Sequence, residues 1–582
     1  MTNRPFRGLA AGALIALATS GCYDLSVATT DDALTRDAVI NDPTLIDRVI
    51  AGVGINLWAG IANASSPHLP LAVLGEELTS SSNDNFMWAI GQEPRPAIDN
   101  QVGTNSLSRD AWSNLYEANA AATEMQRVIR ETGIRIVDPQ TGFDNTQRDL
   151  AWGKFVQGAS HGYLSMLFDK AAIVTDTVDL SEVPDLPFAP YTEVRDSALK
   201  WLDQAATMAE NNVFSFPFTD ALWFWNLSLS NGEFAQVIHS IAARVMVYSA
   251  RTPADRAALD WERVLYHAER SINFDFGPGG DGSRPNPLLT WGYKIYAFNP
   301  PAAANGVTQP GAARVDLRLL GPADTVVIAT GPDAGKTQYQ VWLEKVDKAG
   351  RDTVVPFSVF SPDRRIGRPG QNPTQTGTDP FPIFFRHTTT APPPLEQPPE
   401  RGPYYVSNYY SISRSKAGLN TTGNMEDIRD ISITVAEMDL IRAEALINLG
   451  RAAEALPFIN KTRVTDGGLP AVTTAGPPQS TAAEIASCVP RRFDGTCGNL
   501  MEALMYEKRI ATFGSHGITP YADLRGWGCL LEGTPTDLPI PARQLDLLGR
   551  EIYTFGGQPG QPGSAPVPSA CPLLVNPNVR GS

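Results

Sequence analysis

Residues 433–463 read ITVAEMDLIRAEALINLGRAAEALPFINKTR, and this stretch decides the fold class. Its first half has apolar residues at helical spacing up to Leu449, and its second half repeats that spacing from Ala452 to Arg463. Gly450 lies between the halves, and glycine is typical of the position just beyond a helix end. A connection this short makes the two predicted helices antiparallel neighbours.

Alanine is frequent in both predicted helices, and its small side chain lets them approach closely; the positions are Ala443, Ala445, Ala453 and Ala455. Pro457 argues against the second helix and would kink it unless it falls near the first turn. The pair has the pattern of a tetratricopeptide-type hairpin, although no strict repeat of about 34 residues fits the chain. Irregular repeats with long insertions are therefore predicted instead of a regular solenoid.

Further helical patterns fill residues 43–272. Trp112, Tyr116 and Asn119 are spaced at i, i+4 and i+7 among alanines, as on one face of a helix. The other predicted helices are residues 150–168, 190–208, 234–248 and 261–272. These patterns predict a mainly α protein, a superhelix of tetratricopeptide-like helix hairpins.

Residues 273–430 differ in composition from the helical parts on either side, 43–272 and 431–582. Glycine and proline clusters there break any helix; they lie at 277–282, 299–301 and 392–394. Two alternating, β-rich runs around a short turn predict a β-hairpin at 338–360. We therefore expect a loop-rich insertion that carries the ligand, because loops on a rigid scaffold usually carry binding.

The N-terminus has the features of a lipoprotein signal. Two arginines precede an apolar run at 8–18, which is too short to cross a bilayer core of about 30 Å as a helix. The run leads into Thr19-Ser-Gly-Cys22, and small residues before a cysteine resemble a bacterial lipobox. We expect a signal peptide at 1–21, lipidation of Cys22 and a tether at 22–42. An ordinary cleaved signal peptide is the alternative.

The remaining cysteines form an even set near the C-terminus: Cys488, Cys497, Cys529 and Cys571. Disulfides persist outside the cytoplasm, so two bridges are predicted in an exported chain. Three pairings are possible, and pairing of nearest neighbours would close two C-terminal loops. A zinc site is the rival interpretation, but no CxxC pair or nearby histidine supplies the usual spacing.

The charge balance and the missing motifs exclude several function classes. Asp and Glu number 62 against 47 Lys and Arg, which argues against nucleic acid or anionic lipid as a partner. Six scattered histidines form no metal-ligand cluster, and no GxSxG, P-loop or helix-opening GxGxxG occurs. Acid pairs such as Glu76-Glu77 could serve a glycosidase, but 62 carboxylates produce such pairs by chance. We expect no catalysis, no metal and no cofactor.

Other polar residues are predicted to have structural roles. His161 and His239 lie inside predicted helices that are rich in small residues, as buried histidines do. The charges of the C-terminal segment alternate, and we expect them to form interhelical ion pairs; they are Glu507, Arg509, Asp523 and Arg525.

Aromatic residues are the better functional candidates, because sugar rings present apolar C–H faces that stack on flat side chains. Trp112, Trp201 and Trp261 lie inside predicted helices and are expected in the core. Those in breaker-rich segments are the predicted ligand contacts: Trp88, Trp291, Tyr293, Tyr296, Tyr404, Tyr405, Tyr409 and Tyr410. Asn83 and Asp84 could bond sugar hydroxyls or simply form a turn.

The order of motifs resembles the SusD/RagB family of nutrient-binding outer-membrane lipoproteins over nearly the whole mature chain. Three segments look like its N-terminal helices: WSNLYEAN at 112–119, AWGKFVQGASHGYLSMLFD at 151–169 and IAARVMVY at 241–248. RAEALINLG with INKTR, within 442–463, looks like its alanine-rich helix pair. The most specific evidence is the ordered set YEKR at 506–509, DLRGWG at 523–528 and LPIP at 538–541.

This resemblance implies both a fold and a function. The fold would be a right-handed α-superhelix of about four tetratricopeptide-like hairpins with the ligand surface on irregular loops. The protein would be lipid-anchored in the outer membrane and face the cell exterior. It would capture oligosaccharides, or peptides in some members, without catalysis, and deliver them to a SusC-like TonB-dependent transporter.

Two alternatives stay open from the sequence. One is a tetratricopeptide-like periplasmic scaffold lipoprotein that binds protein partners, which protease treatment of intact cells would spare. The other is a glycosidase, which would turn over a labelled oligosaccharide.

Overall fold

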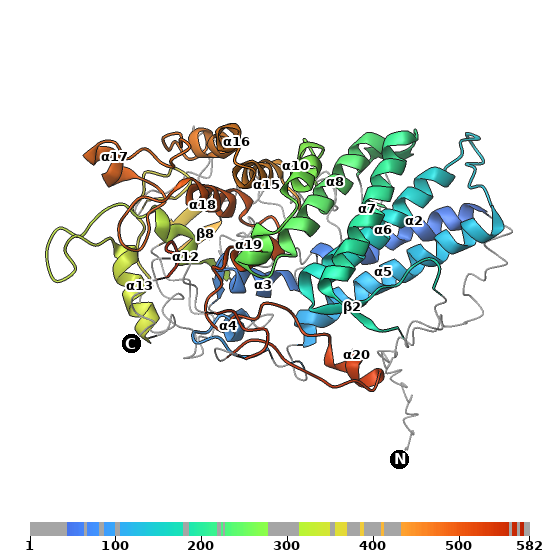
Figure 1. Ribbon diagram of the computed structural model, residues 1–582, viewed down its shortest axis with the longest axis horizontal. Helices are drawn as coiled ribbons and strands as arrows, with labels where there is room; N and C mark the ends of the chain where they lie inside the picture. Colours follow the sequence, from blue (N-terminus) through green and yellow to red (C-terminus); the bar gives the residue numbers. More distant parts are fainter. Residues whose placement is uncertain are drawn as a thin grey trace, which may run out of the picture.

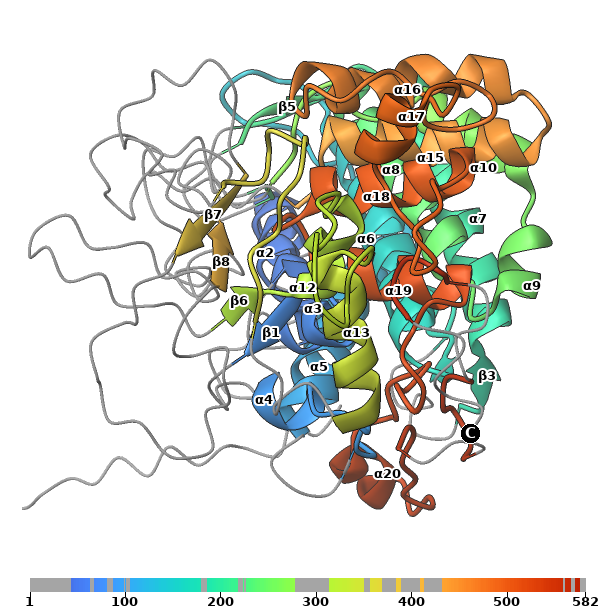
Figure 2. The same cartoon turned by 90° about the vertical axis from the view of Figure 1, so that its left-hand side faces the viewer.

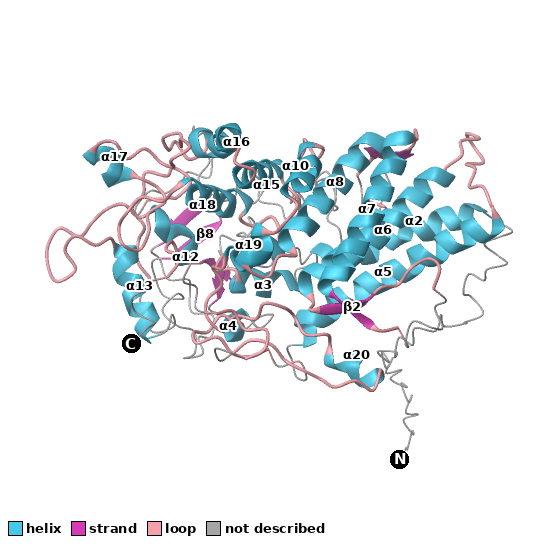
Figure 3. Cartoon of the chain, in the orientation of Figure 1, coloured by secondary structure: helices cyan, strands magenta, loops and turns pink. Residues whose placement is uncertain are grey.

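The computed structural model describes residues 43–62, 67–80, 87–98, 100, 105–178, 186–217, 223–224, 227–277, 313–349, 356–368, 384–388, 409–412, 432–557, 561–566 and 571–575. Helices dominate these residues, which confirms the predicted mainly α fold class (Figure 3). None of the described helices combines the length and apolar character needed to cross a membrane. The predicted signal peptide, Cys22 and the tether lie outside the described residues.

The N-terminal helices pack in chain order. They are α2 (Pro43–Ala62), α5 (Asn105–Thr132), α6 (Thr146–Leu167), α7 (Tyr191–Asn211), α8 (Asn231–Tyr248) and α10 (Trp261–Glu269). Each packs against the next in this series, and Figure 1 shows them as a row across the molecule. Outside this row, the short helices α3 (Leu69–Leu74) and α9 (Pro253–Ala257) pack against the C-terminal helix α19 (Ile518–Trp527), and α4 (Met87–Ile90) packs against α3. The helices predicted from the apolar spacing are therefore confirmed.

Local signals in the sequence fix several helix starts. Ser230 accepts a hydrogen bond from the Glu233 amide and Glu233 bonds back to the Ser230 amide, a capping box that starts α8. Thr252 and Asp255 form the same box at α9, with Pro253 in the first turn, where its missing N–H costs nothing.

The hairpin at 433–463 forms as predicted and extends the row. It consists of α15 (Val435–Asn448), which packs against α10, and α16 (Ala452–Thr465). Gly450 has a φ of 76°, a left-handed conformation that glycine adopts without strain, and this turns the chain between the helices. Helix α16 continues through Pro457. Beyond it follow α17 (Ala482–Ser487), α18 (Leu500–Thr512), α19 (Ile518–Trp527) and α20 (Ala542–Leu547).

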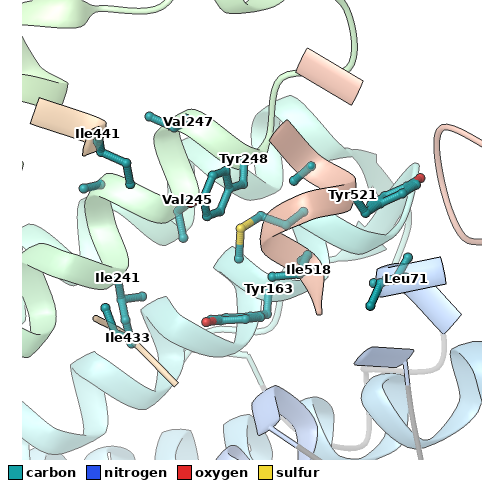
Figure 4. Packing of buried hydrophobic residues seen from close by; sticks show 14 of the residues in the cluster. Leu71, Tyr163, Ile241, Val245, Val247, Tyr248, Ile433, Ile441, Ile518 and Tyr521 are labelled. Carbon is teal, nitrogen blue, oxygen red and sulfur yellow. The ribbon is translucent and has the colours of Figure 1, made fainter. Parts of the chain in front are cut away.

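One hydrophobic core joins the N-terminal and C-terminal helical parts. Tyr163 of α6 and Tyr248 of α8 are buried with Ile441 of α15 and Ile518 of α19 (Figure 4). The predicted core tryptophans Trp112, Trp201 and Trp261 are also buried. The helical parts therefore fold as one body, and the insertion between them does not divide the core.

The predicted β-hairpin at 338–360 is wrong. Residues Gln338–Ala349 form helix α13, residues 350–355 lie outside the described part, and 356–360 have no regular structure. Tyr339, Trp342, Leu343 and Val346 are all buried, and they are spaced at i, i+3, i+4 and i+7. Helical burial of this face overrides the β-propensity of its residues.

The strands in the described residues are short and form four antiparallel pairs. Pairs β1 (Leu78–Ser80) with β6 (Ala313–Val315) and β7 (Phe385–Thr388) with β8 (Tyr409–Ile412) involve the insertion. Pairs β2 (Lys170–Ala172) with β3 (Phe188–Pro190) and β4 (Ser215–Phe216) with β5 (Leu229–Ser230) lie between helices. The insertion also holds α12 (Leu317–Leu320), followed by a short 3₁₀ turn at Gly321–Ala323.

The four C-terminal cysteines form two disulfides. Cys488 pairs with Cys497 and Cys529 with Cys571, with Cα–Cα distances of 5.9 and 5.1 Å. Of the three possible pairings, the structure has the one between nearest neighbours.

Candidate functional site

The charged residues of the C-terminal helices are engaged in buried structural pairs. Glu507 of α18 accepts hydrogen bonds from both terminal nitrogens of Arg365, at 2.7 and 3.0 Å, and Arg463 of α16 lies 3.3 Å away. Asp363 holds the same Arg365 guanidinium at 2.7 Å. The side chain of Glu507 has no exposed surface, so it is not available to a ligand.

A second cluster ties α9, α15, α18 and α19 together. Asp523 lies 2.8 Å from both Lys508 and Arg256, and Arg256 also binds Glu444 at 2.6 Å. Burial alone would raise the pKa of Glu444, but Arg256 and Lys508 outweigh it and lower that pKa to about 2. The predicted ion pairs are thus confirmed for Glu507 and Asp523.

The ion-pair prediction is wrong for Arg509 and Arg525, since neither forms an ion pair among the described residues. Arg525 donates to the carbonyls of Tyr248, Ala250 and Thr536, and Arg509 to those of Glu76 and Arg318. Both arginines satisfy backbone acceptors that would otherwise be buried without a partner.

The acid pair Glu76-Glu77 is also structural. Both side chains are fully buried; Glu76 forms an ion pair with Arg95, and Glu77 accepts the Gly514 amide at 2.7 Å. Carboxylates enclosed in this way cannot flank a glycosidic bond.

The helical histidines have the predicted structural role. His161 accepts the Val174 amide at 3.1 Å and donates to the Gln157 carbonyl at 2.9 Å. Burial lowers the pKa of His161 to about 4, so the ring is neutral near pH 7. His239 lies buried beside His267, with their Nδ1 atoms 3.0 Å apart. Across the described ranges, no three His, Cys, Asp or Glu residues are arranged to hold a metal ion.

Short elements on one side of the molecule bring the insertion and the N-terminal part together. Helix α4 contacts β1, β1 pairs with β6, and β6 contacts β8. Figure 2 shows α4, β1, β6, β7 and β8 together on its left-hand side. We call these five elements the loop-bearing face, because they flank the undescribed stretches 81–86, 278–312 and 389–408.

Trp88 is the predicted ligand residue whose side chain the structure places on the loop-bearing face. It lies in α4, two residues after the undescribed stretch 81–86, and its side chain is partly exposed. Its indole N–H is buried and has no hydrogen-bond partner among the described residues. Because this N–H is covered, the partly exposed ring is the part of Trp88 that a ligand can reach.

Tyr410 has a structural position instead. It is fully buried in β8, its ring packs 5.0 Å from that of His387, and its hydroxyl accepts the Val359 amide at 2.8 Å. Burial raises the pKa of this hydroxyl. Tyr409 lies beside it in β8, with its backbone opposite Thr388. The other predicted ligand residues lie outside the described part: Asn83, Asp84, Trp291, Tyr293, Tyr296, Tyr404 and Tyr405.

Sequence reasoning missed a pocket of about 660 Å³ on another side of the molecule. Lys170 of β2 and Phe188 of β3 line it together with Leu545 of α20 and the following segment, which includes Arg550 and Tyr553. Its walls are more than 350 residues apart in the chain, so no local motif marks it. A second open pocket, of about 570 Å³, lies between α7 and Arg263 of α10.

Comparison with known proteins identifies the fold. No protein-family model and no curated protein matches the sequence. A SusD superfamily protein from Bacteroides vulgatus is 15% identical with a TM-score of 0.50, and the match covers 89% of this chain and 99% of that one. A SusD-like protein from Bacteroides fragilis is 12% identical with a TM-score of 0.51, covering 90% and 98%. The chain therefore has the SusD fold, as the motif order predicts.

Proposed function

We propose that this chain, which has the SusD fold, is a non-catalytic glycan-binding protein of the cell surface. The observation that carries the proposal is the match of about nine-tenths of the chain to SusD-like structures. The loop-bearing face supports it, because it flanks segments that the sequence predicts to be loop-rich, and loops on a rigid scaffold are the usual place for binding. Burial of Glu76 and Glu77 removes the acid pair that the glycosidase alternative could have used.

The proposed ligand surface lies on the loop-bearing face and is centred on Trp88. The flat, partly exposed indole can stack on the apolar face of a sugar ring. The proposed surface also includes Tyr409 and the undescribed residues Asn83, Asp84, Trp291, Tyr293, Tyr296, Tyr404 and Tyr405. Peptides are the alternative ligand.

The proposal includes an anchor and a partner. Cys22 would carry the lipid, and residues 22–42 would tether the body to the outer membrane. A SusC-like TonB-dependent transporter would receive the glycan. Co-purification of such a transporter with the tagged protein from membranes tests the partnership, and a Cys22→Ala variant that stays soluble tests the anchor.

Binding is tested with a glycan panel and two substitutions at one position. Trp88→Ala removes the ring and the N–H, and we expect it to weaken binding of the best glycan about tenfold or more. Trp88→Phe keeps an aromatic ring of smaller area, so its loss of binding should be intermediate. Tyr266→Ala is the control, because Tyr266 is an exposed aromatic on α10, outside the loop-bearing face. Unchanged glycan binding by Trp88→Ala would contradict the proposed surface.

Topology separates this function from the periplasmic scaffold. Protease added to intact cells should degrade the protein if it faces the exterior. Full protection, with degradation only after the outer membrane is opened, would favour the scaffold function instead.

A further inference from the structure

The pocket of about 660 Å³ is built by two segments that do not belong to the loop-bearing face. Figure 1 shows α20 beside β2, and in Figure 2 β3 and α20 lie away from β7 and β8. One wall is the strand pair β2–β3, and the other is the chain from Leu545 to Tyr553. Its volume is in the range of small-molecule sites, roughly 300–1,000 Å³.

Two cations line the pocket, and each is held on an aromatic ring. The Lys170 ammonium lies 4.5 Å from the centre of the Tyr553 ring, and the Arg550 guanidinium lies 4.3 Å from that of Phe188. Such stacking fixes the direction of a long side chain while its N–H donors stay available. The cations are therefore positioned before any ligand arrives.

Neither cation is closely paired with a carboxylate. Arg550 donates to the Leu186 carbonyl at 3.1 Å, and no carboxylate among the described residues is within ion-pair distance of it. The nearest carboxylate to Lys170 is Asp169, at 4.0 Å. The other oxygen of Asp169 already accepts the Tyr553 hydroxyl at 2.6 Å. In contrast, Arg244, Arg256 and Arg365 of the core each have a carboxylate within 3 Å.

The rest of the lining is apolar or carries hydrogen-bond acceptors. Leu545 is buried beneath the pocket, the rings of Phe188 and Tyr553 are half-buried, and Glu551 is exposed at its edge. Apolar floor and ring edges suit the C–H faces of a sugar, and Glu551 can accept hydrogen bonds from hydroxyls. Glu551 repels a phosphate dianion more strongly than it repels the single negative charge of a carboxylate. A carboxylate on a hydroxylated ring therefore suits the charges of Lys170, Arg550 and Glu551 better than a phosphate does.

We propose that this pocket is a second binding site, specific for a carboxylate-bearing sugar such as a uronic acid residue. Lys170 and Arg550 bind the carboxylate, Glu551 accepts from a hydroxyl, and the sugar ring packs over Leu545. The site goes beyond glycan capture at the loop-bearing face and does not depend on it.

The test is calorimetric titration of the purified chain with digalacturonic acid and, separately, with neutral galactobiose. Arg550→Gln and Lys170→Gln should each weaken digalacturonate binding about tenfold, since each removes one charge-assisted contact. Galactobiose should bind far more weakly than digalacturonate. Added salt should weaken digalacturonate binding, because part of it is electrostatic.

Arg270→Gln is the matched control. Arg270 also lies on an aromatic ring, 3.9 Å from the centre of Tyr266, and donates to a backbone carbonyl, but it lines neither of the two pockets described above. It should leave digalacturonate binding unchanged. Thermal melts should show that all three variants remain folded, since the substituted side chains lie at the surface.

Three outcomes would overturn the site: no binding of digalacturonate, equal binding of galactobiose, or equal losses for Arg550→Gln and Arg270→Gln. The two proposals fail separately. Trp88→Ala should leave digalacturonate binding intact. If the protein binds no neutral glycan of the panel, that result would refute the proposed function but not this pocket.

Discussion

Replacing Glu437 by glutamine should destabilise the whole fold, because it removes the carboxylate from a fully buried ion pair between distant parts of the chain. Glu437 of α15 accepts from Arg244 of α8 at 2.8 Å and from the Tyr248 hydroxyl at 2.7 Å. Arg244 also donates to Tyr163 of α6 at 3.1 Å. Neither member of the pair has any exposed side-chain surface.

The size of the expected loss in unfolding free energy follows from the desolvated charge that the substitution leaves in the core. Glu437→Gln keeps the shape but leaves the Arg244 guanidinium without a counter-charge in the core. Removing one partner of a buried pair costs about 3–5 kcal/mol, a large share of a typical unfolding free energy of about 5–15 kcal/mol. The free energy of unfolding in urea, followed by tryptophan fluorescence, measures the loss.

Two further variants make the reasoning refutable. Glu454→Gln breaks a surface pair with Arg451, and the unfolding midpoint should hardly move, because solvent screens exposed charges. The double variant Arg244→Met with Glu437→Leu removes both charges, so it should be more stable than Glu437→Gln alone. If Glu437→Gln is no more harmful than Glu454→Gln, or if the double variant is the least stable of the three, uncompensated buried charge is not the cause.

Two other predictions concern pH and the disulfides. His161 has a pKa of about 4 in the folded protein and 6.5 in the unfolded chain. Between these two pH values the unfolded state binds more protons than the folded state. The free energy of unfolding should therefore fall by about 3 kcal/mol as the pH drops from 6.5 to about 4. Unfolding curves of His161→Gln should show a smaller pH dependence; an equal slope would contradict this. Loss of the Cys529–Cys571 disulfide should cost about 1.4 kcal/mol more stability than loss of Cys488–Cys497, because the first disulfide closes a loop of 42 residues and the second a loop of 9. Urea unfolding of two variants, each with one cysteine pair replaced by serine, measures this difference.

Helix positions could be predicted from this sequence because apolar spacing and end signals agree. At 433–463 the spacing, the alanines and Gly450 all indicate the same hairpin, and the structure confirms it. At 338–349 the signals conflict, since Tyr339, Val341 and Trp342 have high β-propensity while burial follows a helical face. No local rule decides such a conflict, because the decision depends on what the segment packs against.

The site could be predicted only in part. The sequence predicts Trp88 as a ligand residue because a breaker-rich segment precedes it, and its position in α4 on the loop-bearing face keeps that prediction open to test. Tyr410 also lies in a breaker-rich segment of the sequence. In the structure, however, the partner strand β7 and Val359 enclose it. The pocket of Lys170 and Arg550 gave no signal, since its walls meet only in the folded chain.

The buried acids explain how a stack of helix hairpins can hold a fixed ligand face. Hairpins in such stacks contact mainly their neighbours, so elements far along the chain need other connections. Glu76-Glu77 lies just before β1, and its backbone and side chains bind Arg509 and Gly514 at the far end of the sequence. The Asp316 amide next to β6 donates to the Glu77 carbonyl at 3.0 Å. The β1–β6 base of the loop-bearing face is thereby fixed to α18. A residue pair that sequence reasoning attributes to chance is thus the link between the C-terminal helices and the proposed ligand surface.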